Sequence, residues 1–207
     1  MRIPWVVGIS GASGTPYARA VLRGLLAAGE SVDLVVSRAA RLTLLDETGM
    51  AWRDDPDHVA QWLGEQATPD IRIWPAADLA AGPSSGSYPA RGMLVVPAST
   101  EAVAGIALGL SKDLLQRSAA VTLKEGRPLV VVPREMPLAR PTLVHMLALH
   151  DAGAIIAPAS PGFYAGARDA EALADFVAAK VLDAVGVDHQ LMRRWTGQLG
   201  AARRQAD

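Results

Sequence analysis

The sequence predicts a single-domain α/β protein with a Rossmann-like (flavodoxin-like) parallel sheet and helices on both of its faces. Strand-like and helix-like segments alternate from the first residues to about residue 185. A continuous apolar run, Leu129–Val132, is typical of a strand that is buried on both faces of such a sheet. Alternating elements of this kind form right-handed β-α-β units, and no repeat or linker divides the chain. We therefore expect one domain over residues 1–192 and a polar tail over residues 193–207.

The first half of the chain predicts three strands with helices between them. Apolar runs mark the strands, and the first helix is ended by Gly29. In order, we expect a strand at Ile3–Ile9, a helix at Pro16–Ala28, a strand at Ser31–Ser37, helices at Arg38–Thr48 and Pro56–Gln66, a strand at Ile71–Trp74, and a Gly/Ser/Pro-rich loop at Ala77–Arg91.

The second half continues the alternation around the buried strand. In order, we expect a strand at Gly92–Val96, helices at Thr100–Gly109 and Lys112–Lys124, the buried strand at Leu129–Val132, a helix at Arg140–Asp151, a strand at Ala154–Ala157, and a helix at Asp169–Val185.

The composition bounds the class of protein. The chain has 207 residues, a formal net charge of −1 and no cysteine. This charge gives no general attraction to nucleic acid or membrane, and the absence of cysteine excludes disulfides, thiolate metal ligands and a cysteine nucleophile. No apolar stretch reaches the roughly 20 residues of a membrane span, so we expect a soluble, cytoplasmic protein. A slightly positive mean hydropathy indicates surface buried between subunits.

The first candidate site follows the buried strand, where Pro133 is succeeded by Arg134 and Glu135. In open α/β sheets, ligands bind outside the carboxyl ends of the strands. Lys124 and Arg127 stand in the segment that leads into this strand. Such a set of residues can hold a phosphate and also move a proton.

A second candidate is the small-residue loop after the first strand, within Gly8–Ala18. Its glycines let the backbone approach a ligand, Ser10 and Ser13 add hydroxyls, and Pro16 suits the first turn of a helix. The N–H groups at that helix start would attract a phosphate. The spacing matches neither G-x-G-x-x-G nor a Walker loop, so the loop can also serve packing alone.

Other polar residues stand at the ends of helices and strands, where a structural role is also open. Ser37 can be only a helix N-cap, and Glu47 can be a solvated helix residue. Ser99 and Thr100 begin a small-residue helix, which either is simply capped or admits a flat ring. Tyr164 follows the last strand and would reach the same edge of the sheet. Neither metal-ligand spacing nor a Ser-His-Asp pattern links the four histidines, His58, His145, His150 and His189.

Together these motifs resemble the flavin prenyltransferases, the UbiX-like flavoproteins. The resemblance runs from Ile3 to about Trp195, and the order and spacing of the motifs carry it. The motifs are GASG (Gly11–Gly14), SRAA (Ser37–Ala40), DET (Asp46–Thr48), SSGS (Ser84–Ser87), PAST (Pro97–Thr100), the pair Arg117 and Lys124, RPLVVVPRE (Arg127–Glu135) and PGFY (Pro161–Tyr164).

The resemblance implies two adjoining binding sites and no metal. FMN would contact Gly11, Ala12, Ser13, Ser37, Ser99, Thr100, Glu101, Ala102 and Arg134. The phosphate of an allylic substrate would be bound by Arg117, Lys124, Glu135, Tyr164 and Lys180. The catalytic residues would be Ser13, Glu47, Lys124 and Glu135, with Ser13 and Glu47 close to the reacting face of the flavin.

Members of this family transfer a dimethylallyl group from dimethylallyl phosphate to N5 and C6 of reduced FMN. The product, prenylated FMN, is the cofactor of a UbiD-like decarboxylase, which the resemblance therefore implies as a partner. It also implies a homo-oligomer, up to a dodecamer, whose subunits share the site. Loss of phosphate leaves negative charge that Lys124, Lys180 and Arg117 would stabilise. Glu135 would give a proton to the phosphate, and Glu47 would help to remove the proton from C6.

Four residues depart from the usual family pattern, in three places along the chain. Leu79 stands where an aromatic residue is common, Glu101 and Ala102 replace a small residue and a threonine, and Lys180 replaces an arginine. Two functions other than prenyl transfer also stay open for the chain. The chain can be an FMN-dependent cysteine decarboxylase-type flavoprotein, although those use an early histidine and none precedes His58 here. It can also be a flavin carrier without catalysis, which would not need Glu47, Lys124 or Glu135.

Overall fold

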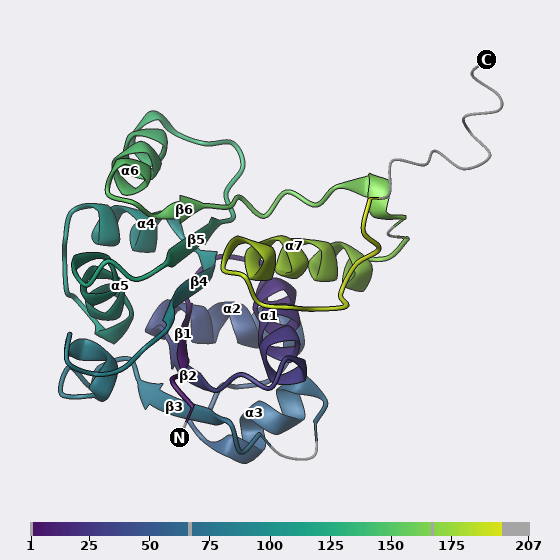
Figure 1. The fold of residues 1–207 in the computed structure, drawn as a ribbon, viewed down its shortest axis with the longest axis horizontal. Coiled ribbons are helices and arrows are strands. Elements are labelled where there is room, and N and C mark those ends of the chain that lie inside the picture. Colours follow the sequence, from purple (N-terminus) through teal and green to yellow (C-terminus); the bar gives the residue numbers. More distant parts are fainter. Residues whose placement is uncertain (1, 66–67, 167, 196–207) are drawn as a thin grey trace.

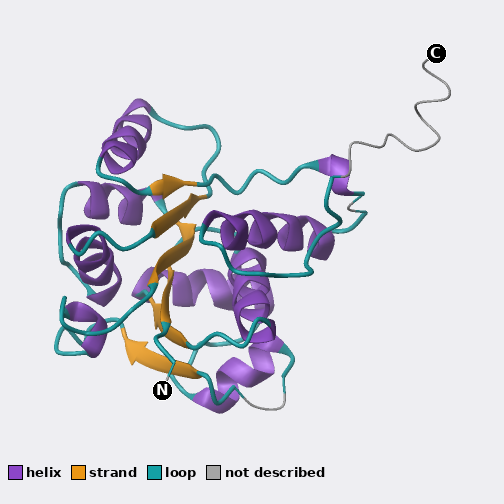
Figure 2. Cartoon of the chain, in the orientation of Figure 1, coloured by secondary structure: helices purple, strands orange, loops and turns teal. Residues whose placement is uncertain are grey.

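Six parallel strands form one sheet in the order β3-β2-β1-β4-β5-β6, and helices cover both of its faces (Figures 1 and 2). The computed structural model describes residues 2–65, 68–166 and 168–195. This strand order is that of the Rossmann fold, so the predicted fold class is confirmed.

The strands are β1 (Trp5–Ile9), β2 (Val32–Val36), β3 (Ile71–Pro75), β4 (Gly92–Ala98), β5 (Leu129–Pro133) and β6 (Ile155–Ile156). The α-helices are α1 (Thr15–Ala27), α2 (Arg38–Thr48), α3 (Pro56–Leu63), α4 (Thr100–Ala107), α5 (Leu114–Lys124), α6 (Arg140–Asp151) and α7 (Ala170–Ala184). The described residues also form the short 3₁₀ helices η1 (Gly82–Ser84) and η2 (Phe163–Ala165).

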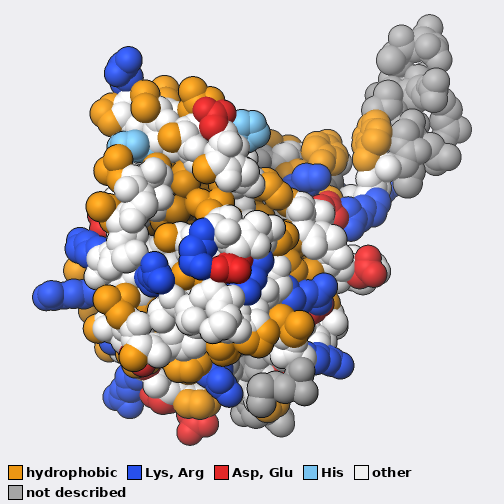
Figure 3. All heavy atoms as spheres, turned by 60° about the vertical axis from the view of Figure 1, so that its left-hand side comes forward, with side chains coloured by type: hydrophobic (Ala, Val, Ile, Leu, Met, Phe, Trp, Pro, Cys, Tyr) orange, Lys and Arg blue, Asp and Glu red, His pale blue; other side chains and the backbone are white. Residues whose placement is uncertain are grey.

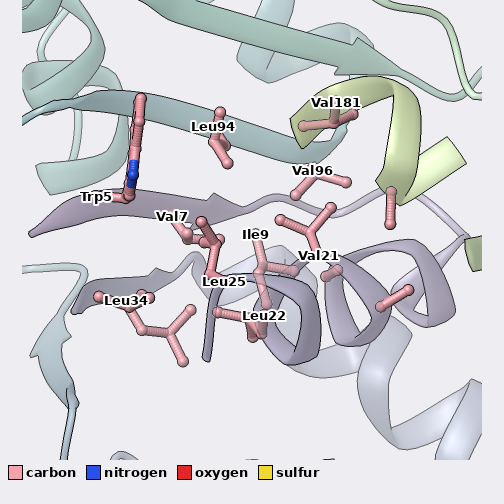
Figure 4. Packing of buried hydrophobic residues seen from close by; sticks show 14 of the residues in the cluster. Trp5, Val7, Ile9, Val21, Leu22, Leu25, Leu34, Leu94, Val96 and Val181 are labelled. Carbon is pink, nitrogen blue, oxygen red and sulfur yellow. The ribbon is translucent and has the colours of Figure 1, made fainter. Parts of the chain in front are cut away.

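Alternate residues of each strand face opposite layers of helices, which explains why the central strands are apolar at nearly every position. Val7 and Ile9 of β1 pack in a buried cluster with α1, α3 and α7, and Figure 4 shows part of this packing. Val6 belongs to a second buried cluster, with α4, α5 and α6. The sheet is therefore held from both sides and fixes the positions of the loops at its two edges.

Most element boundaries agree with the sequence prediction, and the exceptions have local causes. Helices α2 and α6 have the predicted bounds. Helix α3 ends at Leu63, before the predicted Gln66, because Gly64 adopts a left-handed conformation with φ of 76°. Strand β4 continues through Pro97 to Ala98, past the predicted Val96. The missing N–H of Pro97 is tolerated because the register with β5 shifts between Val95 and Ala98.

The predicted tail, residues 193–207, lies outside the described residues from residue 196 onward. Arg194 still belongs to the fold, because its guanidinium donates to both carboxylate oxygens of Asp183 at 2.6 and 2.8 Å. Among the described residues, no helix combines the length and the apolar character needed to cross a membrane.

Candidate functional site

Three neighbouring strands, β2, β1 and β4, are each followed directly by a serine at the carboxyl edge of the sheet, the side where the carboxyl ends of the strands lie. The chain order reverses between β1 and β4, and ligands bind at such a switch point in doubly wound sheets. The buried Ser10 hydroxyl donates to the Pro97 carbonyl at 2.9 Å and accepts from the Ser99 N–H at 2.7 Å. Ser10 therefore joins the loops on both sides of the switch point.

The other two serines cap helices that start at this edge. The Ser37 hydroxyl accepts from the Ala40 N–H at 3.2 Å, and the Ser99 hydroxyl accepts from the Ala102 N–H at 3.1 Å. The capping interpretation of both residues is confirmed. A capping hydroxyl keeps its own hydrogen for donation, so capping and ligand binding are compatible at both positions.

The loop after β1 lies close to the start of α2. A Cβ atom on Gly11 would come within 2.5 Å of the Ala39 Cβ, so only glycine permits this approach. Gly14 has φ of 113°, which is also a conformation that favours glycine. Between the two glycines, Ala12 is buried and Ser13 is exposed. The loop thus presents Ser13 at the surface of the switch-point crevice.

Glu47, in the last turn of α2, binds the start of α1. Its carboxylate accepts from the N–H groups of Gly14 and Thr15, both at 2.8 Å, and from the Thr15 hydroxyl at 2.6 Å. Burial alone would raise the pKa of Glu47, but the hydrogen bonds from Thr15, Ser13 and Gly14 lower it below its ordinary value. The expectation that these N–H groups attract a phosphate is wrong for Gly14 and Thr15, because the Glu47 carboxylate already occupies them.

Arg134 reaches from the end of β5 to the loop after β1. Its Nε donates to the Ser13 carbonyl at 2.9 Å. Ser13, Glu47 and Arg134 line one end of a cavity of about 610 Å³ that extends between α1 and α7. The next residue, Glu135, is exposed, and its carboxylate accepts from the Met136 N–H at 3.1 Å. Ser13, Glu47, Arg134 and Glu135 therefore lie on the carboxyl side of the sheet.

The α5 cations, Arg117 and Lys124, contact a different part of the chain. Arg117 Nε donates to the carbonyl of Ser84 at 2.9 Å. Lys124 forms an ion pair with Glu125 and lies against Gly86, where an added Cβ would be 2.6 Å from the Lys124 Nζ. Both cations thus border the serine loop, Ser84–Ser87.

One chain does not bring Lys124 and Glu135 together. Lys124 ends α5 shortly before β5 begins, whereas Glu135 follows the carboxyl end of β5. The five residues of β5 rise roughly 3.3 Å each, which places these two edges of the sheet roughly 17 Å apart. The residues of the predicted phosphate site are therefore divided between the carboxyl edge and the opposite side of the sheet, the amino edge, where the amino ends of the strands lie.

Tyr164 packs on α7, and Lys180 is part of that helix. The Tyr164 ring packs edge-to-face on Phe176, with centroids 5.4 Å apart, and Lys180 follows Phe176 by one helical turn. Lys180 pairs with Asp183 at 3.6 Å. In Figure 1, the segment between β6 and α7 that carries Tyr164 extends outward from the sheet. Both residues remain exposed at the surface of the chain.

The departures from the family pattern have distinct environments. The Glu101 carboxylate accepts from Gln116 Nε2 at 3.1 Å and pairs with Lys112 at 3.2 Å, so it points toward α5. Leu79 is half-exposed. In the described part of the chain, no group of three or more His, Asp or Glu side chains is arranged to hold a metal ion.

The sequence did not reveal which residues hold the candidate site residues in place by hydrogen bonds. Thr15 went unnoticed as the anchor of Glu47, although a threonine at a helix start is a common capping residue. Asp33 also went unnoticed, although a carboxylate in the apolar run VDLVV must find buried partners.

Comparison with known proteins identifies the family of the chain. The model of the Flavoprotein family matches residues 1–182. A flavin prenyltransferase UbiX from Streptomyces coelicolor is 64% identical over 213 aligned residues, which cover 97% of this chain and 99% of that protein.

Solved structures give the same result. The crystal structure of AnUbiX (PadA1) in complex with FMN and dimethylallyl pyrophosphate has a TM-score of 0.84 and 36% identity, covering 96% of this chain and 100% of that one. A dodecameric FMN-dependent UbiX-like decarboxylase from Escherichia coli O157:H7 also has a TM-score of 0.84, with 39% identity, covering 94% and 100%. The cysteine decarboxylase SpaF, at 17% identity and a TM-score of 0.54, shares the fold alone. By the family match and by identity across nearly its whole length, the chain belongs to the UbiX-like flavin prenyltransferases of the flavoprotein family.

Proposed function

We propose that the chain transfers a dimethylallyl group from dimethylallyl phosphate to N5 and C6 of reduced FMN. The observation that carries this proposal is the crevice at the switch point, where Ser10 joins two loops and Arg134 crosses to Ser13. A structure with FMN and a prenyl donor, similar over 96% of this chain, supports it. The prenylated FMN would pass to a UbiD-like decarboxylase, and we expect both proteins to act in the cytoplasm.

The residues of the crevice fit a flavin mononucleotide. Two serine-capped helix starts and a glycine-bounded loop offer N–H and hydroxyl donors at the carboxyl edge. Arg134 adds a positive charge next to them. FMN would be held by Gly11, Ala12, Ser13, Ser37, Arg134 and the first turn of α4, Ser99–Ala102.

Bound reduced FMN would supply the nucleophilic atoms N5 and C6. The protein's own task is to stabilise the departing phosphate, which keeps the electron pair of the broken carbon–oxygen bond. Lys124, Arg117 and Lys180 would neutralise that charge, and Tyr164 would donate a hydrogen bond to it. Glu135 follows Arg134 directly and, in its protonated form, would deliver its proton to the departing phosphate and become a carboxylate.

Glu47 would act first by holding the loop and only second as a base. Its carboxylate fixes Gly14 and Thr15, and therefore the loop that presents Ser13. A lowered pKa makes a carboxylate a weaker base, so removal of the C6 proton would need Glu47 to lie very close to that atom.

The division of the phosphate site requires a second copy of the chain. Lys124 and Glu135 lie at opposite edges of the sheet, so one subunit would supply the α5 cations and another would supply Glu135. The face that α4, α5 and α6 form carries many exposed hydrophobic side chains (Figure 3), among them Leu108, Leu110, Leu143, Val144 and Leu147. Such a surface suits contact between subunits, and a similar protein is dodecameric. We therefore propose a homo-oligomer with shared sites.

One experiment tests the reaction and the shared site together. The protein is incubated without oxygen with reduced FMN and dimethylallyl phosphate, and the flavin is analysed by mass spectrometry. We expect the wild type to yield a flavin heavier by one prenyl unit. Lys124→Ala and Glu135→Ala should each lose turnover by more than about a hundredfold while they still bind FMN.

Mixing the two inactive variants during assembly should restore activity. Random assortment gives about a quarter of the sites both intact residues, so we expect about a quarter of the wild-type rate. Unmodified FMN from the folded, flavin-bound wild type would contradict the transferase and favour a carrier. An active wild type whose mixed variants stay inactive would contradict only the shared site.

A further inference from the structure

We propose that Asp33, Tyr88 and Arg127 are positioning residues that hold the serine loop against the α5 cations and thereby set the affinity for the allylic phosphate. The inference rests on the proposed function. It adds Asp33 and Tyr88, which lie outside the family motifs, and gives a positioning role to Arg127, the first residue of the motif RPLVVVPRE. The connection runs through hydrogen bonds from Asp33 to Gly86 and ends in the close contact of Gly86 with Lys124.

The connection starts inside the sheet, at Asp33. This residue lies in β2 and is only 2% exposed. It shares a strand face with Val35, which packs in the cluster with α4, α5 and α6. Its carboxylate accepts from Trp74 Nε1 and from the Tyr88 hydroxyl, each at 2.8 Å. A carboxylate so deeply buried needs such partners, because burial without them is strongly unfavourable.

Tyr88 carries the connection from the sheet to the serine loop. Its hydroxyl is bound to Asp33, and its ring lies against Gly82, where an added Cβ would be 2.5 Å from Cε2. Its N–H donates to the Ser85 carbonyl at 3.2 Å. Burial and the neighbouring Asp33 carboxylate raise the pKa of Tyr88 to about 12, so the hydroxyl keeps its proton. Tyr88 thus anchors one end of the loop to β2.

Arg127 fixes the middle of the same loop. Its Nη1 donates to the Tyr88 carbonyl at 3.0 Å, and its Nη2 donates to the Gly86 carbonyl at 2.8 Å. Arg117 holds the other end through the Ser84 carbonyl. Since Gly86 lies directly against Lys124, any shift of the loop also shifts the surroundings of that ammonium group.

The fixed loop presents hydroxyls beside two cations. The hydroxyls of Ser85 and Ser87 lie 2.9 Å apart and bind each other, and both residues are exposed. Together with the α5 cations they form a group of donors suited to phosphate oxygens. The network from Asp33 to Arg127 would therefore act on substrate binding and not on the flavin, which binds at the opposite edge.

The test compares two variants that each remove one donor to the same carboxylate. Tyr88→Phe frees the loop from Asp33, whereas Trp74→Phe removes the donor on β3 and leaves the loop attached. We expect Tyr88→Phe to raise the KM for dimethylallyl phosphate about fivefold to tenfold, with kcat and FMN affinity near the wild-type values. Trp74→Phe should leave that KM unchanged even if it lowers the melting temperature equally. Arg127→Lys keeps the positive charge but loses the paired Nη1 and Nη2 donors, so we expect it to raise the KM as Tyr88→Phe does.

A second measurement does not depend on turnover. Amide hydrogen exchange of Ser84, Ser85 and Tyr88, whose N–H groups bond within this segment, should become about tenfold faster in Tyr88→Phe and stay unchanged in Trp74→Phe. Unchanged exchange, or an unchanged KM in an active enzyme, would overturn the positioning role. A wild type without product would instead overturn the proposed function, and the exchange experiment would still decide on the network.

Discussion

The two edges of the sheet are each organised around one carboxylate, and the two carboxylates behave in opposite ways. Glu47, at the carboxyl edge, is exposed and accepts from the backbone at the start of α1. Asp33, toward the amino edge, is buried in a strand and accepts from Trp74 and Tyr88. Each ties together segments that are distant in sequence.

The difference lies in how much water each carboxylate has lost. Burial raises the pKa of Asp33, and the hydrogen bonds from Trp74 and Tyr88 offset only part of that effect. At Glu47 the hydrogen bonds outweigh burial, and the pKa falls. Similar hydrogen bonding therefore gives opposite shifts, because desolvation of the charged form dominates at one edge and not at the other.

Removing a cation from each edge gives the largest expected contrast. Arg134→Ala should weaken FMN binding about a hundredfold, because it removes a charge that crosses the crevice and leaves the Ser13 carbonyl without this donor. Lys124→Ala should change FMN affinity by less than about twofold. Titration of FMN fluorescence measures both, with Arg53→Ala, an exposed arginine between α2 and α3, as the control. Equal losses at both edges would mean that the flavin contacts them both.

The pH dependence of stability should separate the two carboxylates. The pKa of Glu47 is lowered, so its stabilising contribution is present above its ordinary value of 4.5 and is lost as the pH falls through the folded-state value. The stability gap between wild type and Glu47→Gln should therefore close on acidification.

Asp33 should show the opposite trend. Its pKa is raised, so a cost appears as the pH rises from its ordinary value of 3.8 through the folded-state value. Wild type should thus gain stability relative to Asp33→Asn as the pH falls in that window. Melting temperatures from about pH 3 to about pH 7 measure both gaps. If both stability gaps changed in the same direction with pH, the two carboxylates would not differ in this way.

The smallest effect is expected at Glu101. Its carboxylate binds Gln116 and the exposed Lys112, and it points toward α5. Glu101→Gln should change FMN affinity by less than about twofold and the free energy of unfolding by less than about 0.5 kcal/mol. Fluorescence titration and thermal melting check these values. A tenfold gain in FMN affinity would show that the carboxylate repels the flavin after all.

The sequence predicted the fold well because its local rules agree with one another. Ser37 and Gly49 mark both ends of α2, and the buried run of β5 has only one compatible environment. The element ends that were predicted wrongly also have local causes. Pro97 suggested an early end to β4, but a register shift accommodates it. Gly64 ended α3 early by its left-handed conformation.

The site was predictable as a set of residues but not as an arrangement. The motifs identified Ser13 and Arg134, which are in contact, and Glu135, which follows the carboxyl end of the same strand as Arg134. The family resemblance also placed Lys124 with Glu135 in one phosphate site, and ten residues lie between the two in sequence. A strand occupies that interval, and its extended length separates the residues in space. The partners of Glu47 escaped prediction because hydrogen bonds between distant segments leave no periodic pattern.

The length of β5 has a kinetic consequence for the proposed enzyme. If each catalytic unit draws its phosphate cations and its proton donor from different chains, an isolated subunit carries only half of the machinery. The specific activity would then fall on dilution, since turnover per chain depends on how many chains are assembled. A five-residue strand would thus make the concentration of the protein itself a control on flavin modification.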